Sequence, residues 1–216
     1  HLARLADERL LLVLRGGQAS ILVQALQRFV LRAKIRLEAT ATAALGTGPA
    51  LPLGQVEEDA DSLRLGCGEH SLRLGGSSDD AWQLPQLRLG WPWLPETLLD
   101  QLLPPALDLE RLGATALDKG CYPGQEIVAR LHYRGGHKWQ LQRVRLPAAA
   151  SAATPGAALY ASAQAVGHLL NLAPAPDGLE ALAVLSEQAV GHSLSTQEGD
   201  AVQLLDCAHI PARETI

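Results

Sequence analysis

The chain has 216 residues and a formal net charge of −5 at pH 7. Hydrophobic residues make up 47% of it and charged residues 19%, which excludes an intrinsically disordered chain and a polycation. The length allows one large domain or two modest ones. No run of about 18 apolar residues is present, so we expect a cytoplasmic protein with no membrane partner.

Cysteine usage argues against a metal centre and against a disulfide framework. The three cysteines are Cys67, Cys121 and Cys207, and none of them belongs to a CxxC or Cys/His cluster with the spacing of zinc ligands. A chain of this length with so few cysteines is also not a disulfide scaffold. We therefore predict no metal site.

The first third of the chain predicts a strand, a helix and further strands. Residues 9–14 form an apolar run typical of a buried strand, and apolar residues recur at helical spacing over 18–29. Alternation of apolar and charged residues over 31–39 predicts a half-exposed strand. The repeated pentapeptide SLRLG at 62–66 and 71–75 flanks a glycine-containing turn and predicts a β-hairpin.

Tryptophans mark the middle of the chain. A flat heteroaromatic ligand would stack on an indole, and Trp82 is the candidate for this role. Trp91 and Trp93, in a GWPW run, favour core packing instead. A short helix is predicted over 96–102, because Pro104 stops it.

Residues 119–126, Lys-Gly-Cys-Tyr-Pro-Gly-Gln-Glu, predict a tight loop that leads into a helix. Cys121 lies between two glycines and close to Lys119. A helix N-terminus and a nearby ammonium both favour the thiolate, which is the form that acts as a nucleophile or redox group. Cys121 and Lys119 are therefore the candidate catalytic residues. The alternative is a buried structural thiol, and we assign Cys67 and Cys207 to that alternative.

A charge asymmetry follows this loop. No Asp or Glu occurs from Ile127 to Pro176. Arg130 and Arg134 are four residues apart and would share one helix face. With Lys138 they would form a cationic rim that attracts phosphates or carboxylates. The alternative is an ordinary solvated surface.

Short strands and turns dominate from residue 138 onward and predict a small antiparallel β-barrel. The predicted strands cover 138–146, 157–161, 164–172, 179–185 and 201–206. We place a domain boundary between an α+β body, residues 1–136, and a barrel domain, residues 137–216.

The motif at 119–126, with Ala129-Arg130 and Tyr133-Arg134-Gly135 after it, resembles the signature of the YgfZ family. These are folate-binding proteins related to the T protein, the aminomethyltransferase of the glycine cleavage system. The weaker agreement upstream is collinear and is carried by Trp82, Gly90-Trp91-Pro92, Pro104, Leu109, Leu112 and Gly113. The resemblance is strongest from 104 to 136.

The resemblance implies a glycine-cleavage T-protein-like folate-binding body with a C-terminal antiparallel β-barrel. It implies tetrahydrofolate, or a derivative, as ligand, and a role in maintaining iron–sulfur enzymes, including those that modify tRNA. The implied partners are folate and iron–sulfur enzymes or their assembly factors, with tRNA only indirect, and we expect a monomer. Cys121 is the residue on which this activity would turn. The implied folate-binding residues are Trp82, Tyr122, Gln125, Glu126, Arg130 and Arg134.

The chain also departs from the pattern of its relatives. The family's N-terminal part would precede His1, so we expect it to be missing. The related aminomethyltransferases carry a pterin-binding Glu in an E-A-G run, where this chain has Arg88-Leu89-Gly90. Their equivalent of K-G-C-Y lacks the Cys, so Cys121 favours a YgfZ-type function. Two alternatives stay open, a tetrahydrofolate-dependent one-carbon-transfer enzyme and a tRNA-docking module.

Overall fold

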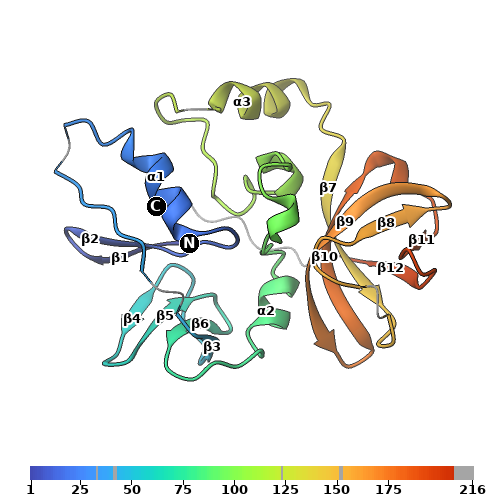
Figure 1. Cartoon of the computed structure of the whole chain (residues 1–216), viewed down its shortest axis with the longest axis horizontal. Coiled ribbons are helices and arrows are strands. Elements are labelled where there is room, and N and C mark those ends of the chain that lie inside the picture. Colours follow the sequence, from blue (N-terminus) through green and yellow to red (C-terminus); the bar gives the residue numbers. More distant parts are fainter. Residues whose placement is uncertain (33, 41–42, 123, 151–152, 207–216) are drawn as a thin grey trace. The chain divides into compact units, whose positions relative to one another are not determined.

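The computed structural model (Figure 1) describes residues 1–32, 34–40, 43–122, 124–150 and 153–206. The chain divides into two compact units, His1–Pro85 and Gln86–Ile216. The domain boundary predicted before residue 137 falls inside the second unit, just ahead of the first barrel strand. The division into a folate-binding body and a barrel domain stays a prediction.

The first unit contains two antiparallel sheets and a helix. Strands β1 (Leu2–Ala6) and β2 (Arg9–Leu12) pair with each other, and helix α1 (Ala19–Gln27) follows them. The second sheet has the order β3-β6-β5-β4, and its strands are β3 (Leu45–Gly48), β4 (Val56–Glu58), β5 (Ser62–Gly66) and β6 (Ser71–Gly75). The helix predicted over 18–29 is therefore confirmed.

The predicted SLRLG hairpin is confirmed in its register. Leu63 lies opposite Leu74, and Leu65 lies opposite Leu72, so the leucines of both strands share one face. Leu63, Leu65 and Leu72 are buried. The alternation of apolar and polar residues thus selects the buried face of this sheet.

The strand predicted over 31–39 is wrong, because no strand forms in the described part of that range. Ile35, which alternation would place on a buried face, is 59% exposed. The edge of β6 is occupied by β3 instead. Alternation shows which side chains would share a face, but a strand also needs a neighbouring strand to satisfy its backbone groups.

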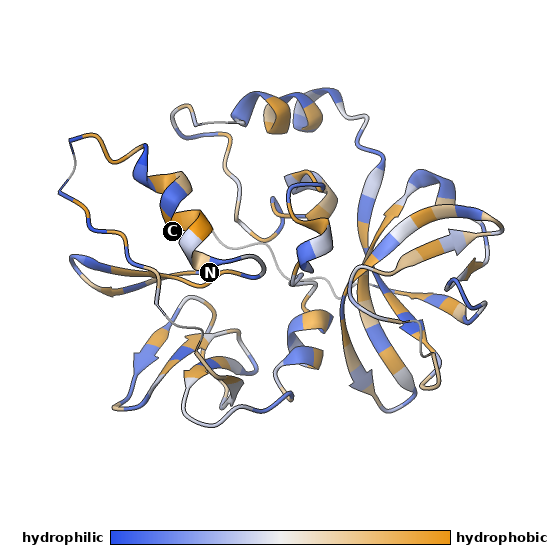
Figure 2. Ribbon diagram, viewed as in Figure 1, coloured by the Kyte–Doolittle hydropathy of each residue, from blue (hydrophilic) through white to orange (hydrophobic). Residues whose placement is uncertain are grey.

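The second unit is built around a closed antiparallel barrel with the strand order β10-β7-β12-β11-β8-β9. Its strands are β7 (Trp139–Leu146), β8 (Ala158–Ala161), β9 (Gln164–Ala175), β10 (Gly178–Ser186), β11 (Leu194–Ser195) and β12 (Ala201–Leu205). The predicted barrel is confirmed, and it contains one strand, β11, that was not predicted. Hydrophobic and hydrophilic residues follow one another along these strands (Figure 2) because successive side chains point to opposite sides. Val144, Leu159, Leu169, Ala181 and Ala183 are completely buried in the barrel core.

The segment ahead of the barrel covers part of its outer surface. This segment contains α2 (Gln83–Arg88) and the 3₁₀ turns η1 (Glu96–Leu98) and η2 (Pro104–Leu107), and η2 contacts β7. The backbone N–H of Trp93 donates to Oδ1 of Asn171 on β9 at 3.2 Å. Leu182 and Val184 on β10 lie outside the barrel's core cluster and are still completely buried. Trp91 is buried as well, which agrees with the predicted core role.

The helix predicted over 96–102 is shorter than expected. Only Glu96–Leu98 is helical, as a 3₁₀ turn. Asp100 has a φ of +61°, a left-handed conformation that an α-helix does not continue through. The turn therefore ends well before the proline at 104 that was expected to stop it.

Helix α3 (Gln125–Arg134) confirms the helix predicted after the 119–126 loop. Gly124 precedes it with a φ of +84°, and Gly135 ends it with a φ of +65°. These left-handed values suit glycine, which carries no Cβ. Among the described residues, no helix combines the length and the apolar character that crossing a membrane requires.

Candidate functional site

The loop before α3 presents the thiol of Cys121 to solvent. Cβ atoms added at Gly120 or Gly124 would meet no other heavy atom within 4 Å. The chain at Gly124 nevertheless needs glycine because of its positive φ. The expectation that Cys121 stands on a turn, and not inside a packed strand, agrees with this geometry.

Tyr122 fastens the loop to the helix. Its backbone N–H donates to Oε1 of Gln125 at 3.3 Å, and the backbone N–H of Gln125 donates to the Tyr122 carbonyl at 3.1 Å. Nζ of Lys119 lies 4.9 Å from the centroid of the Tyr122 ring, a cation–π contact. These contacts hold residues on both sides of Cys121. The structure thus gives Lys119 a partner in Tyr122, and its predicted influence on the Cys121 thiolate stays a prediction.

The hydroxyl of Tyr122 is a polar group without a protein partner. Its oxygen is buried and makes no hydrogen bond within the described part of the chain. A buried hydroxyl usually finds a partner, because leaving it unpaired costs free energy. The contacts within the described part of the chain therefore leave the hydrogen-bonding capacity of this hydroxyl unused.

The predicted cationic rim is only partly brought together. Arg130 and Arg134 lie one turn apart on α3, both exposed, and neither forms an ion pair with another described residue. Glu126, in the first turn of α3, is exposed as well. Nζ of Lys138 lies 3.5 Å from Oε1 of Glu187, beside the barrel. Lys138 is therefore excluded from the cationic rim, which now consists of Arg130 and Arg134.

Trp82 belongs to the first unit, where it is half-buried in the turn that precedes α2. Its folate contact stays a prediction. Arg88, at the position where related enzymes carry a pterin-binding Glu, donates two hydrogen bonds to Glu180, at 2.7 and 3.1 Å. The Arg88 side chain is therefore engaged in an ion pair with a residue of barrel strand β10.

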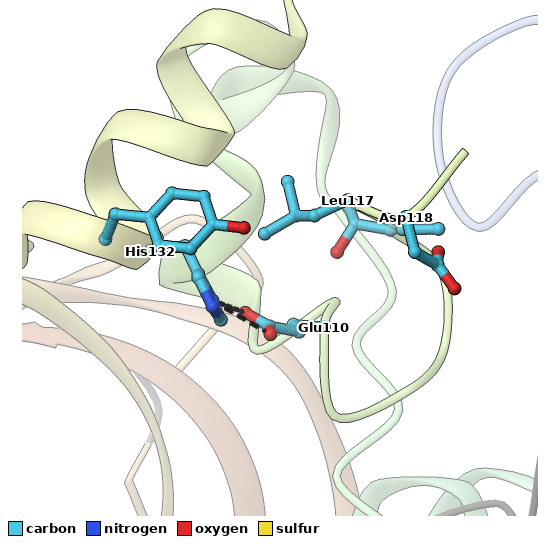
Figure 3. A pocket seen from close by; sticks show the side chains of 7 residues that line it. Glu110, Leu117, Asp118 and His132 are labelled. Carbon is cyan, nitrogen blue, oxygen red and sulfur yellow. Dashed lines mark hydrogen bonds and ion pairs between the residues drawn. The ribbon is translucent and has the colours of Figure 1, made fainter. Parts of the chain in front are cut away.

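A pocket of about 360 Å³ lies beside the same loop and helix (Figure 3). It is lined by Glu110, Thr115, Ala116, Leu117, Asp118, His132 and Tyr133. Nδ1 of His132 lies 3.0 Å from the Glu110 carboxylate, which joins α3 to the segment after η2. Neither His132 nor Glu110 was among the predicted site residues. No signal joins these two residues, because 22 positions separate them.

Of the described cysteines, only Cys67 remains besides Cys121. Cys67 is buried, and its Sγ donates to the Leu65 carbonyl at 3.3 Å, as expected for a structural thiol. Cys207 lies outside the described residues. In the described ranges, no group of three or more His, Cys, Asp or Glu side chains is placed to hold a metal ion.

Comparison with known proteins finds relatives that share part of this chain's sequence. No family model matches the chain. It is 36% identical over 81 residues to the "tRNA-modifying protein YgfZ" of Edwardsiella ictaluri, a match that covers 38% of this chain and 24% of that protein. The protein of the same name from Vibrio atlanticus is 37% identical over 67 residues, covering 31% and 21%. The one from Escherichia coli is 36% identical over 78 residues, covering 34% and 24%. The chain thus matches about a quarter or less of each relative's length.

Proposed function

This chain is a homologue of the YgfZ proteins, and we propose on that basis that it binds tetrahydrofolate and supports iron–sulfur enzymes, and through them tRNA modification. The observation that carries the proposal is the exposed thiol of Cys121, displayed on the loop whose sequence defines the resemblance. A thiol that acts on partner enzymes must be accessible to them, whereas a structural thiol is normally buried.

The contacts around Cys121 support a built site. Two reciprocal hydrogen bonds join Tyr122 to Gln125, and the Lys119 ammonium lies over the Tyr122 ring. Restricting the residues on both sides of the thiol lowers the entropy lost when it engages a partner. The loop is thereby preorganised for contact with another molecule.

Tetrahydrofolate fits the residues that the second unit offers. Its glutamate tail ends in carboxylates, and Arg130 and Arg134 present two guanidinium groups without counter-ions in the described chain. Tyr122, whose hydroxyl has no hydrogen-bond partner among the described residues, precedes the same helix, α3, in the chain. In the first unit, the proposed contact for the flat pterin is the indole of Trp82, as the resemblance implies. When bound, tetrahydrofolate would be an acceptor for a one-carbon unit.

Two measurements on the same protein test the proposal. Tetrahydrofolate is titrated while tryptophan fluorescence is followed, and an iron–sulfur enzyme is assayed in cells that lack or contain the protein. We expect saturable quenching and a higher enzyme activity in cells that contain it. Conversion of tetrahydrofolate to a one-carbon derivative by the protein alone would indicate a transfer enzyme instead. Absence of quenching would contradict the proposed binding of tetrahydrofolate.

A further inference from the structure

We propose that the pocket beside α3 binds an organic cation, an ammonium, guanidinium or amidinium group carried on an apolar body. We call it the acidic pocket and define it by Glu110, Thr115, Ala116, Leu117, Asp118, His132 and Tyr133. Its volume of about 360 Å³ suits a small molecule or a single inserted side chain. The inference goes beyond the proposed function and does not depend on it.

The charges of the pocket select a cation. Two carboxylates line it, and neither Lys nor Arg does. The Glu110 carboxylate already has a partner in Nδ1 of His132, at 3.0 Å. The carboxylate of Asp118 is exposed and has no hydrogen bond or ion pair with any other described residue. Asp118 is therefore an acceptor without a partner among the described residues, and a cationic group in the pocket would meet two carboxylates.

The remaining walls fit the body of such a ligand. Tyr133 is 75% exposed, and the His132 ring packs against it at 87°, with the centroids 4.9 Å apart. A cation near the face of an aromatic ring is attracted by the ring quadrupole. Ala116 and Leu117 add half-buried apolar surface for a hydrocarbon stem. Figure 3 shows Leu117 and Asp118 on one side of the pocket and His132 with Glu110 on the other.

The pocket belongs to the same loop and helix as the thiol. Asp118 stands three residues before Cys121 in the chain, and His132 and Tyr133 lie in the last turns of α3. A ligand in the acidic pocket would therefore contact the elements that position Cys121. The same chemistry has two sources, a free small molecule or a basic side chain of a partner protein.

Calorimetric titration with benzamidinium tests the site, and benzamide, which has nearly the same shape and no charge, serves as the control ligand. We expect saturable binding of benzamidinium, weakened by added salt, and a much weaker response to benzamide. Asp118→Asn should weaken binding about tenfold. Tyr133→Leu should weaken it about three- to tenfold. Asp206→Asn removes the same charge beyond β12 and should leave binding unchanged.

The sources are separated by comparing agmatine with the tripeptide amide Gly-Arg-Gly. Tighter binding of the tripeptide assigns the pocket to a partner's side chain, and tighter binding of agmatine assigns it to a free small molecule; both support the site. Equal binding of benzamidinium and benzamide would overturn the proposal. So would unchanged affinity in Asp118→Asn, or competitive displacement of benzamidinium by tetrahydrofolate, which would assign the pocket to folate.

Discussion

Glu180, buried on barrel strand β10, accepts two hydrogen bonds from the guanidinium of Arg88, at 2.7 and 3.1 Å. Arg143 and Arg145 on β7 approach the same carboxylate to within 4.0 Å. The hydrogen bonds from Arg88 lower the pKa of Glu180 below its ordinary value, against the opposing effect of burial. This contact joins the end of α2 to the barrel across 92 positions of sequence.

Acid should destabilise the protein through Glu180. Because its pKa is lower in the folded state, the carboxylate adds stability above the unfolded pKa of about 4.3, and this stability is lost as the pH falls from there toward the folded pKa. Glu180→Gln should lower the free energy of unfolding at pH 7 by about 2–3 kcal/mol, because it leaves Arg88 without its carboxylate. It should also reduce the stability difference between neutral pH and about pH 3. Urea unfolding at both pH values measures these changes.

Glu187→Gln is the matched control for this prediction. Glu187 pairs with Lys138 at 3.5 Å, and both side chains are more than half exposed. Exposed pairs contribute about 0–1 kcal/mol, so this variant should unfold nearly as the parent does. Equal effects of the two substitutions would contradict a special role for Glu180.

The two described cysteines should differ in reactivity. Cys121 is exposed on its loop, whereas Cys67 is 5% exposed and hydrogen-bonded to the Leu65 carbonyl. Iodoacetamide should therefore label Cys121 first, and Cys67 only when the first unit opens. Peptide mapping by mass spectrometry after timed labelling measures both rates. Comparable rates would show that Cys121 is less accessible than its place in the fold indicates.

The sequence predicts local structure well where pattern and turn chemistry agree. The SLRLG pair gives its hairpin register, and the glycine at 124 marks the start of α3. Alternation alone failed over 31–39, because nothing in that pattern says which strand would lie beside it. Strand β3, which does pair with β6, is a short segment with two glycines and carries no such pattern.

Site features formed by residues adjacent in sequence were predicted, whereas contacts between residues far apart in the chain were not. The 119–126 motif predicted the loop, the exposed thiol and the following helix, all of which are contiguous in sequence. Contacts such as Arg88 with Glu180, or Glu110 with His132, join residues far apart in the chain. Such contacts depend on tertiary packing, which one sequence read for periodicity does not encode. The partner of Lys138 was missed for this reason.

Trp82 should contribute directly to folate affinity. Removing an aromatic stacking partner in Trp82→Ala should weaken tetrahydrofolate binding by roughly 1–3 kcal/mol. Fluorescence titration measures the affinity, with Trp139→Ala as the control, because Trp139 lies on the barrel strand β7. Unchanged affinity in Trp82→Ala, or an equal loss in the control, would exclude Trp82 as the pterin contact.

Arg130 and Arg134 on α3, which form no ion pair with another described residue, should set the preference for longer folate tails. Polyglutamylated tetrahydrofolate should bind more tightly than the monoglutamate, and the difference should shrink as salt screens the charges. Arg130→Gln combined with Arg134→Gln should remove most of the difference. Lys138→Gln should preserve it, because Lys138 is paired with Glu187. A preference that survives the double substitution would place the tail elsewhere.

The proposed function depends most on the thiol of Cys121, which Cys121→Ser tests directly. The hydroxyl keeps the size of the side chain but does not supply a thiolate. In a bacterial strain without its own YgfZ protein, the level of tRNA nucleosides made by an iron–sulfur enzyme is measured by mass spectrometry. We predict that the parent chain restores this level and that Cys121→Ser, although folded and able to bind tetrahydrofolate, does not, while Cys67→Ser restores it to the extent that it folds. Restoration by Cys121→Ser to the level of the parent would contradict the account and assign the function to folate binding alone.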